Sequence, residues 1–296
     1  LLSSASGPSR HLRGILLALA GVVVISPDGL LIRLISVDPW TLLFWRGLLI
    51  AVAFAVVQLI QYGRGLPAAY AAIGGRGLMA SAIRGAGMVF FVLAVRHTTI
   101  ANTLIILGMT PLWGAVLSRL LLREAVPTRT WLAIPAALAG IALTISADYG
   151  GGNAGDLFAL MGSGCLAFYL TLVRQARHLD MTPSLAISGA FVAAAVLPLA
   201  TPATLGLRDG ALLAIMGLVM LPVALALFVR APRYILAPEV SLVFLLEMVI
   251  GPYWVWVALG EQPSALTIAG GGVVMPTLAV HTGLALRESV AQRPSQ

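Results

Sequence analysis

The chain has 296 residues, of which 59% are hydrophobic and 10% are charged, with a mean hydropathy of +0.98. These proportions leave too few polar side chains to cover a water-soluble globule of this size, and they argue against a soluble enzyme. Because a membrane span needs about 20 mostly apolar residues, the composition predicts an all-α polytopic membrane protein. The formal charge of +7 comes from arginines dispersed between apolar blocks, which argues against a nucleic-acid interface, where basic residues share one face.

Ten long apolar runs without strand alternation predict ten transmembrane helices. In chain order, the runs cover residues 14–36, 40–61, 77–96, 99–122, 131–147, 155–174, 184–201, 211–230, 237–259 and 264–286. Prolines interrupt seven of the ten runs. Helices kinked in this way suit a protein that alternates between conformations in the membrane.

The distribution of arginine predicts the orientation of these helices. All 18 basic residues are arginine, and cytoplasmic loops are enriched in positive charge. With the N-terminus inside, 13 arginines fall on the cytoplasmic face and three, Arg33, Arg96 and Arg208, on the outer face. We therefore expect the inner (plasma) membrane, with both termini cytoplasmic. The acidic residues expected on the outer face are Asp38, Asp148, Asp156, Asp209 and Glu261.

Weak internal similarity relates the first five spans to the last five. At an offset of 141 residues Gly21 falls on Gly162, and at an offset of 137 the end of the fourth span falls on the end of the ninth. Because five is an odd number of crossings, the second half must be inverted relative to the first. The sequence thus predicts two inverted five-helix repeats, residues 1–148 and 149–296, with a substrate site where they meet.

The fourth and ninth spans carry paired motifs, Thr110-Pro111…Arg123-Glu124 and Glu247-Met248…Gly260-Glu261, each followed by a small-residue-rich helix. With the ten spans and the duplication, these motifs resemble the drug/metabolite transporter superfamily and, within it, the EamA-type exporters, over about residues 12–287. The resemblance implies secondary, non-ATP-driven export of small metabolites, with amino acids a common substrate class. Met248 replaces the second proline of the family pattern, so a bend in the ninth helix is expected at Gly251-Pro252 instead.

Four charged residues lie inside predicted spans, and they are candidates for function because an unpaired charge in hydrocarbon is costly. Asp28 and Arg46 lie at similar depths, and either they form a structural ion pair or a helix break at Ser26-Pro27 makes Asp28 part of a substrate or gate site. Glu247, near the middle of the ninth span, either pairs with an arginine or binds a substrate ammonium or a proton. Arg84 is expected to extend toward cytoplasmic water.

Aromatic and polar side chains at comparable depths are candidates to line a cavity for amphipathic solutes. They are Asn102 and Trp113 on the fourth span, Tyr169 on the sixth and Trp254 on the ninth. Each of them can instead serve helix packing or an interfacial aromatic belt. Glu124 and Glu261, at helix ends, are expected at the membrane interface.

The resulting hypothesis is a secondary transporter that exports small amphipathic metabolites, with amino acids favoured, by alternating access through a central cavity between the repeats. The alternatives are an exchanger of phosphorylated or nucleotide-linked sugars, a membrane channel and a non-transporting scaffold. The chain lacks lysine and catalytic motifs, so neither a phosphate-cradling loop nor an enzyme is expected. No cofactor, metal or nucleic acid is predicted; the expected partners are a small-molecule substrate and membrane lipid, with proton coupling and the oligomeric state left open.

Overall fold

The computed structural model describes residues 8–121, 128–146, 153–176, 179–231, 234–235, 240 and 243–291, and every regular element within them is a helix. The prediction of an all-helical chain is therefore confirmed. The longer α-helices are α1 (Pro8–Ile25), α3 (Pro39–Tyr62), α5 (Gly74–His97), α7 (Thr110–Leu121), α8 (Thr128–Ser146), α9 (Asn153–Gln175), α10 (Pro183–Val196), α12 (Leu221–Arg230), α14 (Glu247–Leu259) and α15 (Ala265–Ala291). The shorter ones are α2 (Asp28–Leu34), α4 (Leu66–Ala72), α6 (Ile100–Leu107) and α11 (Leu207–Ala214).

Seven segments of the described chain are long and apolar enough to cross a membrane, whereas the sequence predicted ten spans. Three shorter apolar helices, Thr130–Ser146, Pro183–Val196 and Glu247–Leu259, fall in the fifth, seventh and ninth predicted spans. At a rise of 1.5 Å per residue, the 13 residues of α14 reach only about 20 Å, less than the roughly 30 Å of hydrocarbon. The multi-pass architecture is thus established, while the count of ten spans stays a prediction.

Side chains on the outside of the bundle are apolar, as lipid requires. Ile60 is 81% exposed, Leu132 73% and Val257 62%. Contiguous apolar surface of this kind is rare on a soluble monomer. In a bilayer it costs nothing, because the surrounding hydrocarbon is as apolar as the side chains themselves.

The first, fourth and eighth predicted spans are interrupted. A turn at Ser26-Pro27 separates α1 from α2, which is the break that one of the two interpretations of Asp28 expected, and a turn at Gly108-Met109 separates α6 from α7. In the eighth span, a π-helical segment, η3 (Ile215–Met220), joins α11 to α12. Pro222 lies two residues after the end of this segment, and because proline has no N–H to donate, the wider turn accommodates the lost helical bond.

The ninth span differs from the prediction. Helix α14 continues without interruption through Gly251 and Pro252, where the sequence predicted a bend. The turn lies instead at Leu245-Leu246, immediately before Glu247. Proline is tolerated inside α14 because neighbouring helices in a membrane bundle can satisfy the carbonyl that it leaves without a partner.

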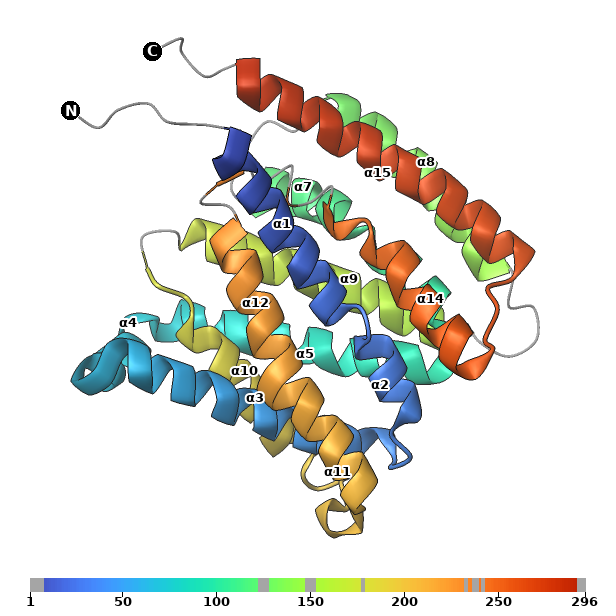
Figure 1. Ribbon diagram of the computed structural model, residues 1–296. Coiled ribbons are helices and arrows are strands. Elements are labelled where there is room, and N and C mark those ends of the chain that lie inside the picture. Colours follow the sequence, from blue (N-terminus) through green and yellow to red (C-terminus); the bar gives the residue numbers. More distant parts are fainter. Residues whose placement is uncertain are drawn as a thin grey trace, which may run out of the picture.

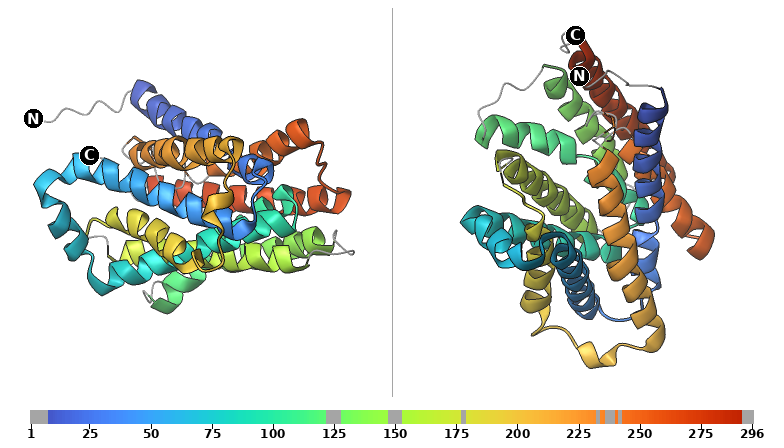
Figure 2. Two further views of the ribbon diagram at one scale, coloured as in Figure 1. Left: turned by 90° about the horizontal axis from the view of Figure 1, so that it is seen from below. Right: turned by 60° about the vertical axis from the view of Figure 1, so that its left-hand side comes forward.

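The helices pack in pairs that join the two halves of the sequence (Figure 1). Helix α3 lies along α10, α5 along α9, α8 along α15 and α1 along α12, and the shorter α14 packs on α6. The two further views show the same interleaving of blue-to-green and yellow-to-red helices (Figure 2). Helix α1 begins and α15 ends at one end of the bundle (Figure 1).

Glycines allow two of these pairs to approach closely. A Cβ atom added to Gly47 of α3 would lie 2.7 Å from the carbonyl oxygen of Gly189 on α10, and one added to Gly189 would lie 2.5 Å from the carbonyl oxygen of Gly47. Gly140 of α8 and Gly270 of α15 face each other in the same reciprocal way. Small residues at such crossings let helix backbones touch, which is a main source of helix association in membranes.

Some predicted features lie outside the described residues. These are Arg123 and Glu124 at the end of the fourth span, and Asp148 with the glycine-rich loop that follows it.

We expect Gly47→Ala to destabilise the fold, because its methyl group would meet backbone atoms of α10, at 2.7 Å from the Gly189 oxygen and 3.0 Å from the Ala193 nitrogen. Overpacking of this kind costs about 1–3 kcal/mol, so Tm in detergent should fall by several degrees. The control is Gly164→Ala on α9, where an added Cβ meets nothing within 4 Å. Equal Tm values for Gly47→Ala and the parent protein would contradict the close crossing.

Candidate functional site

The break between α1 and α2 places a carboxylate inside the bundle, with polar groups beside it. Asp28 is the first residue of α2 and is 6% exposed. Ser26, in the break, donates its hydroxyl to the Val23 carbonyl at 3.0 Å and accepts the indole N–H of Trp254 at 2.9 Å. The break in the first span is therefore connected directly to α14.

Asp28 and Arg46 form a bidentate ion pair between α2 and α3. The two terminal nitrogens of Arg46 donate to the two carboxylate oxygens of Asp28, each at 2.8 Å. Arg46 is only 4% exposed, so water does not screen the pair. Two parallel hydrogen bonds between planar groups are the strongest geometry available to an arginine and a carboxylate. The structure thus contains the Asp28–Arg46 contact that the structural-pair interpretation requires.

Arg46 also touches the eighth span and the third. Its Nη1 atom lies 2.7 Å from the sulfur of Met216, in the π-helical segment, and its guanidinium is 5.9 Å from the centre of the Phe91 ring on α5. The Nε atom is buried without a hydrogen-bond partner. Arg46 therefore joins α2, α3, α5 and η3 at one point, and π-helical turns are often found at such functional positions.

Glu247 begins α14 and has no ion-pair partner among the described residues. Its Oε2 atom is buried without a hydrogen bond. Gly251, one turn later, packs against Leu104 of α6, and the Asp28 carboxylate is near enough to interact electrostatically with Glu247. The sequence allowed Glu247 either to pair with an arginine or to bind a substrate ammonium or a proton. The described residues contain no arginine in contact with Glu247, so the first interpretation lacks its contact.

The four aromatic and amide candidates occupy different surroundings. Trp254 donates to Ser26, beside the Asp28–Arg46 pair. Tyr169 is 8% exposed and shares a hydrogen bond with the Ser184 hydroxyl at 3.2 Å. Trp113 packs against a separate apolar cluster, and its indole N–H is buried without a partner. Asn102 is fully buried in a polar network at the end of the bundle rather than beside Glu247.

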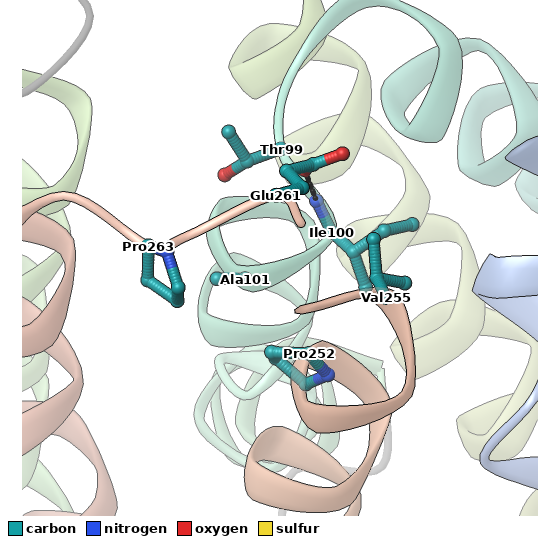
Figure 3. Close-up of a pocket in the computed structure, with 7 residues that line it drawn as sticks. All are labelled: Thr99, Ile100, Ala101, Pro252, Val255, Glu261 and Pro263. Atoms are coloured by element: carbon teal, nitrogen blue, oxygen red, sulfur yellow. Dashed lines mark hydrogen bonds between the residues drawn. The ribbon is translucent and has the colours of Figure 1, made fainter. Parts of the chain in front are cut away.

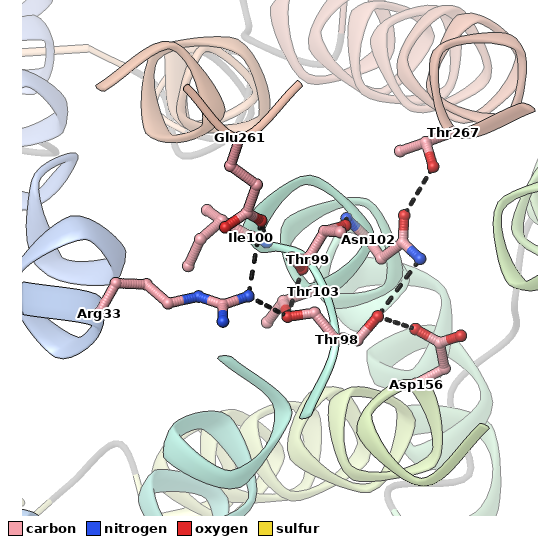
Figure 4. A network of polar contacts seen from close by, with 9 residues as sticks. All are labelled: Arg33, Thr98, Thr99, Ile100, Asn102, Thr103, Asp156, Glu261 and Thr267. Atoms are coloured by element: carbon pink, nitrogen blue, oxygen red, sulfur yellow. Dashed lines mark hydrogen bonds and ion pairs between the residues drawn. The ribbon is translucent and has the colours of Figure 1, made fainter. Parts of the chain in front are cut away.

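That network joins four parts of the chain and is drawn in Figure 4. Arg33 of α2 donates to the Thr98 carbonyl at 2.6 Å and lies 3.5 Å from the Glu261 carboxylate. The same carboxylate accepts the backbone N–H of Ile100 at 3.3 Å. The Thr98 hydroxyl donates to Asp156 of α9 at 2.9 Å. These contacts hold α2, the α5–α6 junction, α9 and the α14–α15 connection together.

Asn102 connects this network to the tenth span. Its side-chain oxygen accepts from the Thr267 hydroxyl at 2.8 Å, and its side-chain nitrogen donates to the Thr98 hydroxyl at 3.3 Å. We call Arg33, Thr98, Asn102, Asp156, Glu261 and Thr267 the outer-end network, because the predicted orientation assigns its charged members to the outer face. The ends of α2 and α14, next to which Arg33 and Glu261 lie, are at the opposite end of the bundle from the start of α1 and the end of α15 (Figure 1).

Two more acidic residues hold backbone N–H groups at this end. Asp38 accepts the backbone N–H groups of Trp40 and Thr41 at 2.9 and 3.0 Å, at the start of α3. Slight burial raises the pKa of Asp38, but the hydrogen bonds from Thr41 and Trp40 outweigh it and hold this pKa below its usual value. Asp209 accepts the N–H of Ser36 at 3.0 Å. Both carboxylates therefore fix the α2–α3 connection.

A small pocket lies beside the outer-end network, between the start of α6 and the second half of α14 (Figure 3). It is a shallow depression without room for a solute, and it is lined by Thr99, Ala101, Pro252 and Glu261, among others. Among the described residues, no group of three His, Cys, Asp or Glu side chains could hold a metal ion. The polar groups of this region make contacts between helices.

Sequence reasoning found the inner charges but missed most of the outer-end network. It assigned Arg33, Asp156 and Glu261 to one face of the membrane, yet gave no reason to expect that they meet. The three lie on spans far apart in the chain. The structure also places the Arg84 guanidinium 5.7 Å from the centre of the Tyr169 ring, a contact that the sequence did not predict.

A bundle of apolar helices, interrupted beside buried charges, indicates a multi-pass membrane protein. Residues 12–146 match the model of the EamA-like transporter family. The match confirms the resemblance to the EamA-type exporters over these residues. EamA proteins are membrane transporters of small molecules. No curated protein matches the chain.

Fifteen solved chains match the structure. One of them, described only as the crystal structure of a protein, covers 93% of this chain and is itself covered to 98%, with a TM-score of 0.65 and 16% sequence identity. At this identity the likeness shows the fold alone. Because the match spans nearly all of the chain, the shared fold extends over both halves.

Breaking the Asp28–Arg46 pair should destabilise the protein strongly, because each single substitution leaves a buried charge without its partner. Removing one partner of such a pair costs about 3–5 kcal/mol. Asp28→Arg and Arg46→Asp should each abolish most of the monodisperse protein seen by size-exclusion chromatography, and the double variant should recover part of it. Arg208→Gln, at an exposed position of α11, serves as the control. No recovery in the double variant would count against a purely structural pair.

Proposed function

We propose that the chain is a secondary transporter of ten spans, arranged as two inverted five-helix repeats, residues 1–148 and 149–296, that exports small amphipathic metabolites, with amino acids as the favoured class. The observation that carries this proposal is the Glu247 carboxylate. It lies inside an apolar bundle, without an ion-pair partner in the described structure, directly after a helix break. A binding site for a transported solute or proton explains such a residue.

The packing of the helices supports the inverted repeat. If the spans are numbered in chain order, exchange of the halves turns the first span into the sixth, the second into the seventh, and so on. The second span packs on the seventh, the fourth on the ninth and the fifth on the tenth. Exchange of the halves converts each of these three contacts into itself. The third packs on the sixth and the first on the eighth. These two contacts are images of each other, as a two-fold axis in the membrane plane requires.

Two reciprocal glycine contacts support the same axis. Gly47 and Gly189 touch each other's backbones where the second span crosses the seventh, and Gly140 and Gly270 do so where the fifth crosses the tenth. A residue close to a two-fold axis meets its own counterpart, because the axis brings equivalent positions together. Both crossings have this property.

The positions of the helix breaks support the repeat in a third way. The break between α6 and α7 is at Gly108-Met109, and the break before α14 is at Leu245-Leu246. The two are 137 residues apart, which is the offset that relates the fourth and ninth spans in the sequence. Broken helices in equivalent positions of two repeats are typical of transporter binding sites.

The closed outer end suits alternating access. The outer-end network connects α2, α6, α9 and α15, which belong to four different spans. For export, this end must open after a solute has entered from the cytoplasm. The contacts are suited to that step, since the side chains of Arg33 and Glu261 are 25% and 26% exposed. When their ion pair opens, water can solvate both charges.

The competing functions fit less well. An exchanger of phosphorylated or nucleotide-linked sugars needs several free cationic groups, and Arg46 is occupied by Asp28. A scaffold gives no reason for an unpaired Glu247. A channel stays the main alternative, and transport kinetics separate it from a carrier. The favoured location is the inner membrane with both termini cytoplasmic, and Glu247 is the group suited to carry a proton if transport is proton-coupled.

The proposal predicts saturable exchange. Proteoliposomes containing the purified protein and loaded with unlabelled amino acid should accumulate labelled amino acid by counterflow, because a carrier returns loaded more readily than empty. The measurement is uptake against external concentration for a panel of amino acids and other metabolites. Saturation and counterflow are expected, while linear flux without counterflow would identify a channel.

Glu261→Gln should favour opening of the outer end, because it removes the charge that faces Arg33. The loss of one partly exposed ion pair is worth up to ~1 kcal/mol, or about a fivefold change in population. The reporter is Ala101→Cys in a Cys165→Ala background, since Ala101 lines the pocket beside Glu261 and is 6% exposed. A membrane-impermeant maleimide applied from outside should label it about fivefold faster in the Glu261→Gln variant. Equal labelling rates, or the same increase with Arg208→Gln, would exclude a gate at this position.

A further inference from the structure

The charges inside the bundle are unequally compensated. Asp28, Arg46, Arg84 and Glu247 lie in apolar helices and sum to zero charge. Asp28 and Arg46 neutralise each other through two hydrogen bonds. Arg84 and Glu247 have no ion pair or side-chain hydrogen bond among the described residues, so one positive and one negative group in the bundle lack a partner of opposite charge.

Arg84 is held in place by an aromatic ring rather than by an anion. Its guanidinium lies over Tyr169 of α9, 5.7 Å from the ring centre, and the Tyr169 hydroxyl is in turn hydrogen-bonded to Ser184. A cation–π contact offsets only part of the cost of removing a guanidinium from water. The planar donors of arginine remain suited to a carboxylate, which they can bind in a bidentate manner.

Arg84 and Glu247 lie at similar depths on different helices. Arg84 is 13 residues before the end of α5 at His97, or about 20 Å, and Glu247 is 12 residues before the end of α14 at Leu259, or about 18 Å. Both helices end beside the outer-end network. Arg46 is only about 10 Å from the start of α3 at the same end, so the ion pair lies between that end and the two uncompensated charges.

The Asp28–Arg46 pair lies near both groups. Arg84 and Phe91 are seven residues apart on one face of α5, and Phe91 lies under the Arg46 guanidinium. Asp28, which pairs with Arg46, is within electrostatic range of both Arg84 and Glu247. The uncompensated charges therefore flank the Asp28–Arg46 pair rather than belonging to separate regions of the bundle.

We infer that Arg84, supported by the Tyr169 ring, receives the carboxylate of the transported solute while Glu247 receives its ammonium group, so that the preferred substrates are zwitterions. The inference rests on the proposed function and names the charges of its substrate. A solute with only an ammonium group would leave the charge of Arg84 uncompensated. A solute with only a carboxylate would leave the charge of Glu247 uncompensated. A zwitterion satisfies both without changing the net charge of the bundle.

The test measures binding separately from transport. The probes are leucine, its decarboxylated amine (3-methylbutylamine) and its deaminated acid (4-methylpentanoate), with phenylalanine and threonine as further zwitterions. Binding to purified parent protein is followed by the ligand-induced shift in Tm and by tryptophan fluorescence. Leucine should bind the parent protein about tenfold or more tightly than either single-charge analogue, because each analogue lacks one charge-assisted contact.

The variants assign each charge to its residue. Arg84→Gln should weaken leucine binding about tenfold and leave the amine unaffected, whereas Glu247→Gln should weaken leucine similarly and leave the acid unaffected. Arg84→Lys should restore part of the leucine affinity, and Arg208→Gln should match the parent protein. Size-exclusion profiles and the Tm without ligand identify any variant that fails to fold.

Three results would overturn the inference: no binding of any zwitterion, equal affinity of the parent protein for all three leucine-related probes, or a uniform loss for all three in Arg84→Gln. If a protein with one of these binding patterns still shows counterflow, the proposed transport function is supported and only the charge assignment is wrong. If binding is charge-selective but counterflow is absent, the charge assignment is supported and the proposed transport function is wrong.

Discussion

A charge inside an apolar helix bundle is costly unless an opposite charge compensates it, and the Asp28–Arg46 pair is where this constraint shapes the molecule most directly. The pair requires α1 to break at Ser26-Pro27, so that Asp28 begins a new helix facing Arg46. It also brings the π-helical segment close enough for Met216 to touch the guanidinium. Two interrupted spans and one continuous span are therefore organised around a single bidentate contact, and Trp254 connects the ninth span to the same break.

The second and seventh spans form the firmest unit of the bundle. Helices α3 and α10 cross with glycine backbones in contact, and polar contacts join them near both ends. Near one end the Thr41 hydroxyl accepts the backbone N–H of Thr201, and near the other the Gln58 amide donates to the Thr182 carbonyl. In contrast, α2, α6 and α14 are short helices beside breaks, and they carry or adjoin the uncompensated charges. Such an arrangement suits a rigid support with movable helices around the binding site.

The location of Glu247 shows how a helix break can create a site. If the ninth span bent at Gly251-Pro252, Glu247 would lie one turn inside a continuous helix. With the turn at Leu245-Leu246, Glu247 is instead the first residue of α14, where the positive end of the helix dipole favours an anion. The carboxylate can thus remain in the bundle without a protein cation, which is the state that a substrate ammonium or a proton requires.

Features of the fold and the site that depend on residues close together in the sequence were predictable. Features that depend on packing between distant helices were not. Hydropathy and the arginine distribution are local properties of the chain, and they predicted a multi-pass helical protein. The Ser26-Pro27-Asp28-Gly29 segment is local too, and a break there was one of two interpretations. The spacing of Asp28 and Arg46 put both residues at one depth, so their pairing could be anticipated as one of two interpretations. The continuity of α14 through Pro252 could not, because the packing around a proline decides whether its helix bends.

By itself, the sequence determined that the chain is an apolar helical membrane protein with a few charges inside its spans, since composition and helix length are sufficient for that. Only the tertiary structure decided which charges compensate each other. Arg33, Thr98, Asp156 and Glu261 meet although they are up to 228 residues apart, while Glu247 and Arg84 are left without opposite charges in the described structure. The physical reason is that pairing depends on which faces of distant helices meet, and helix packing sets those faces through shape and glycine contacts that no local pattern records.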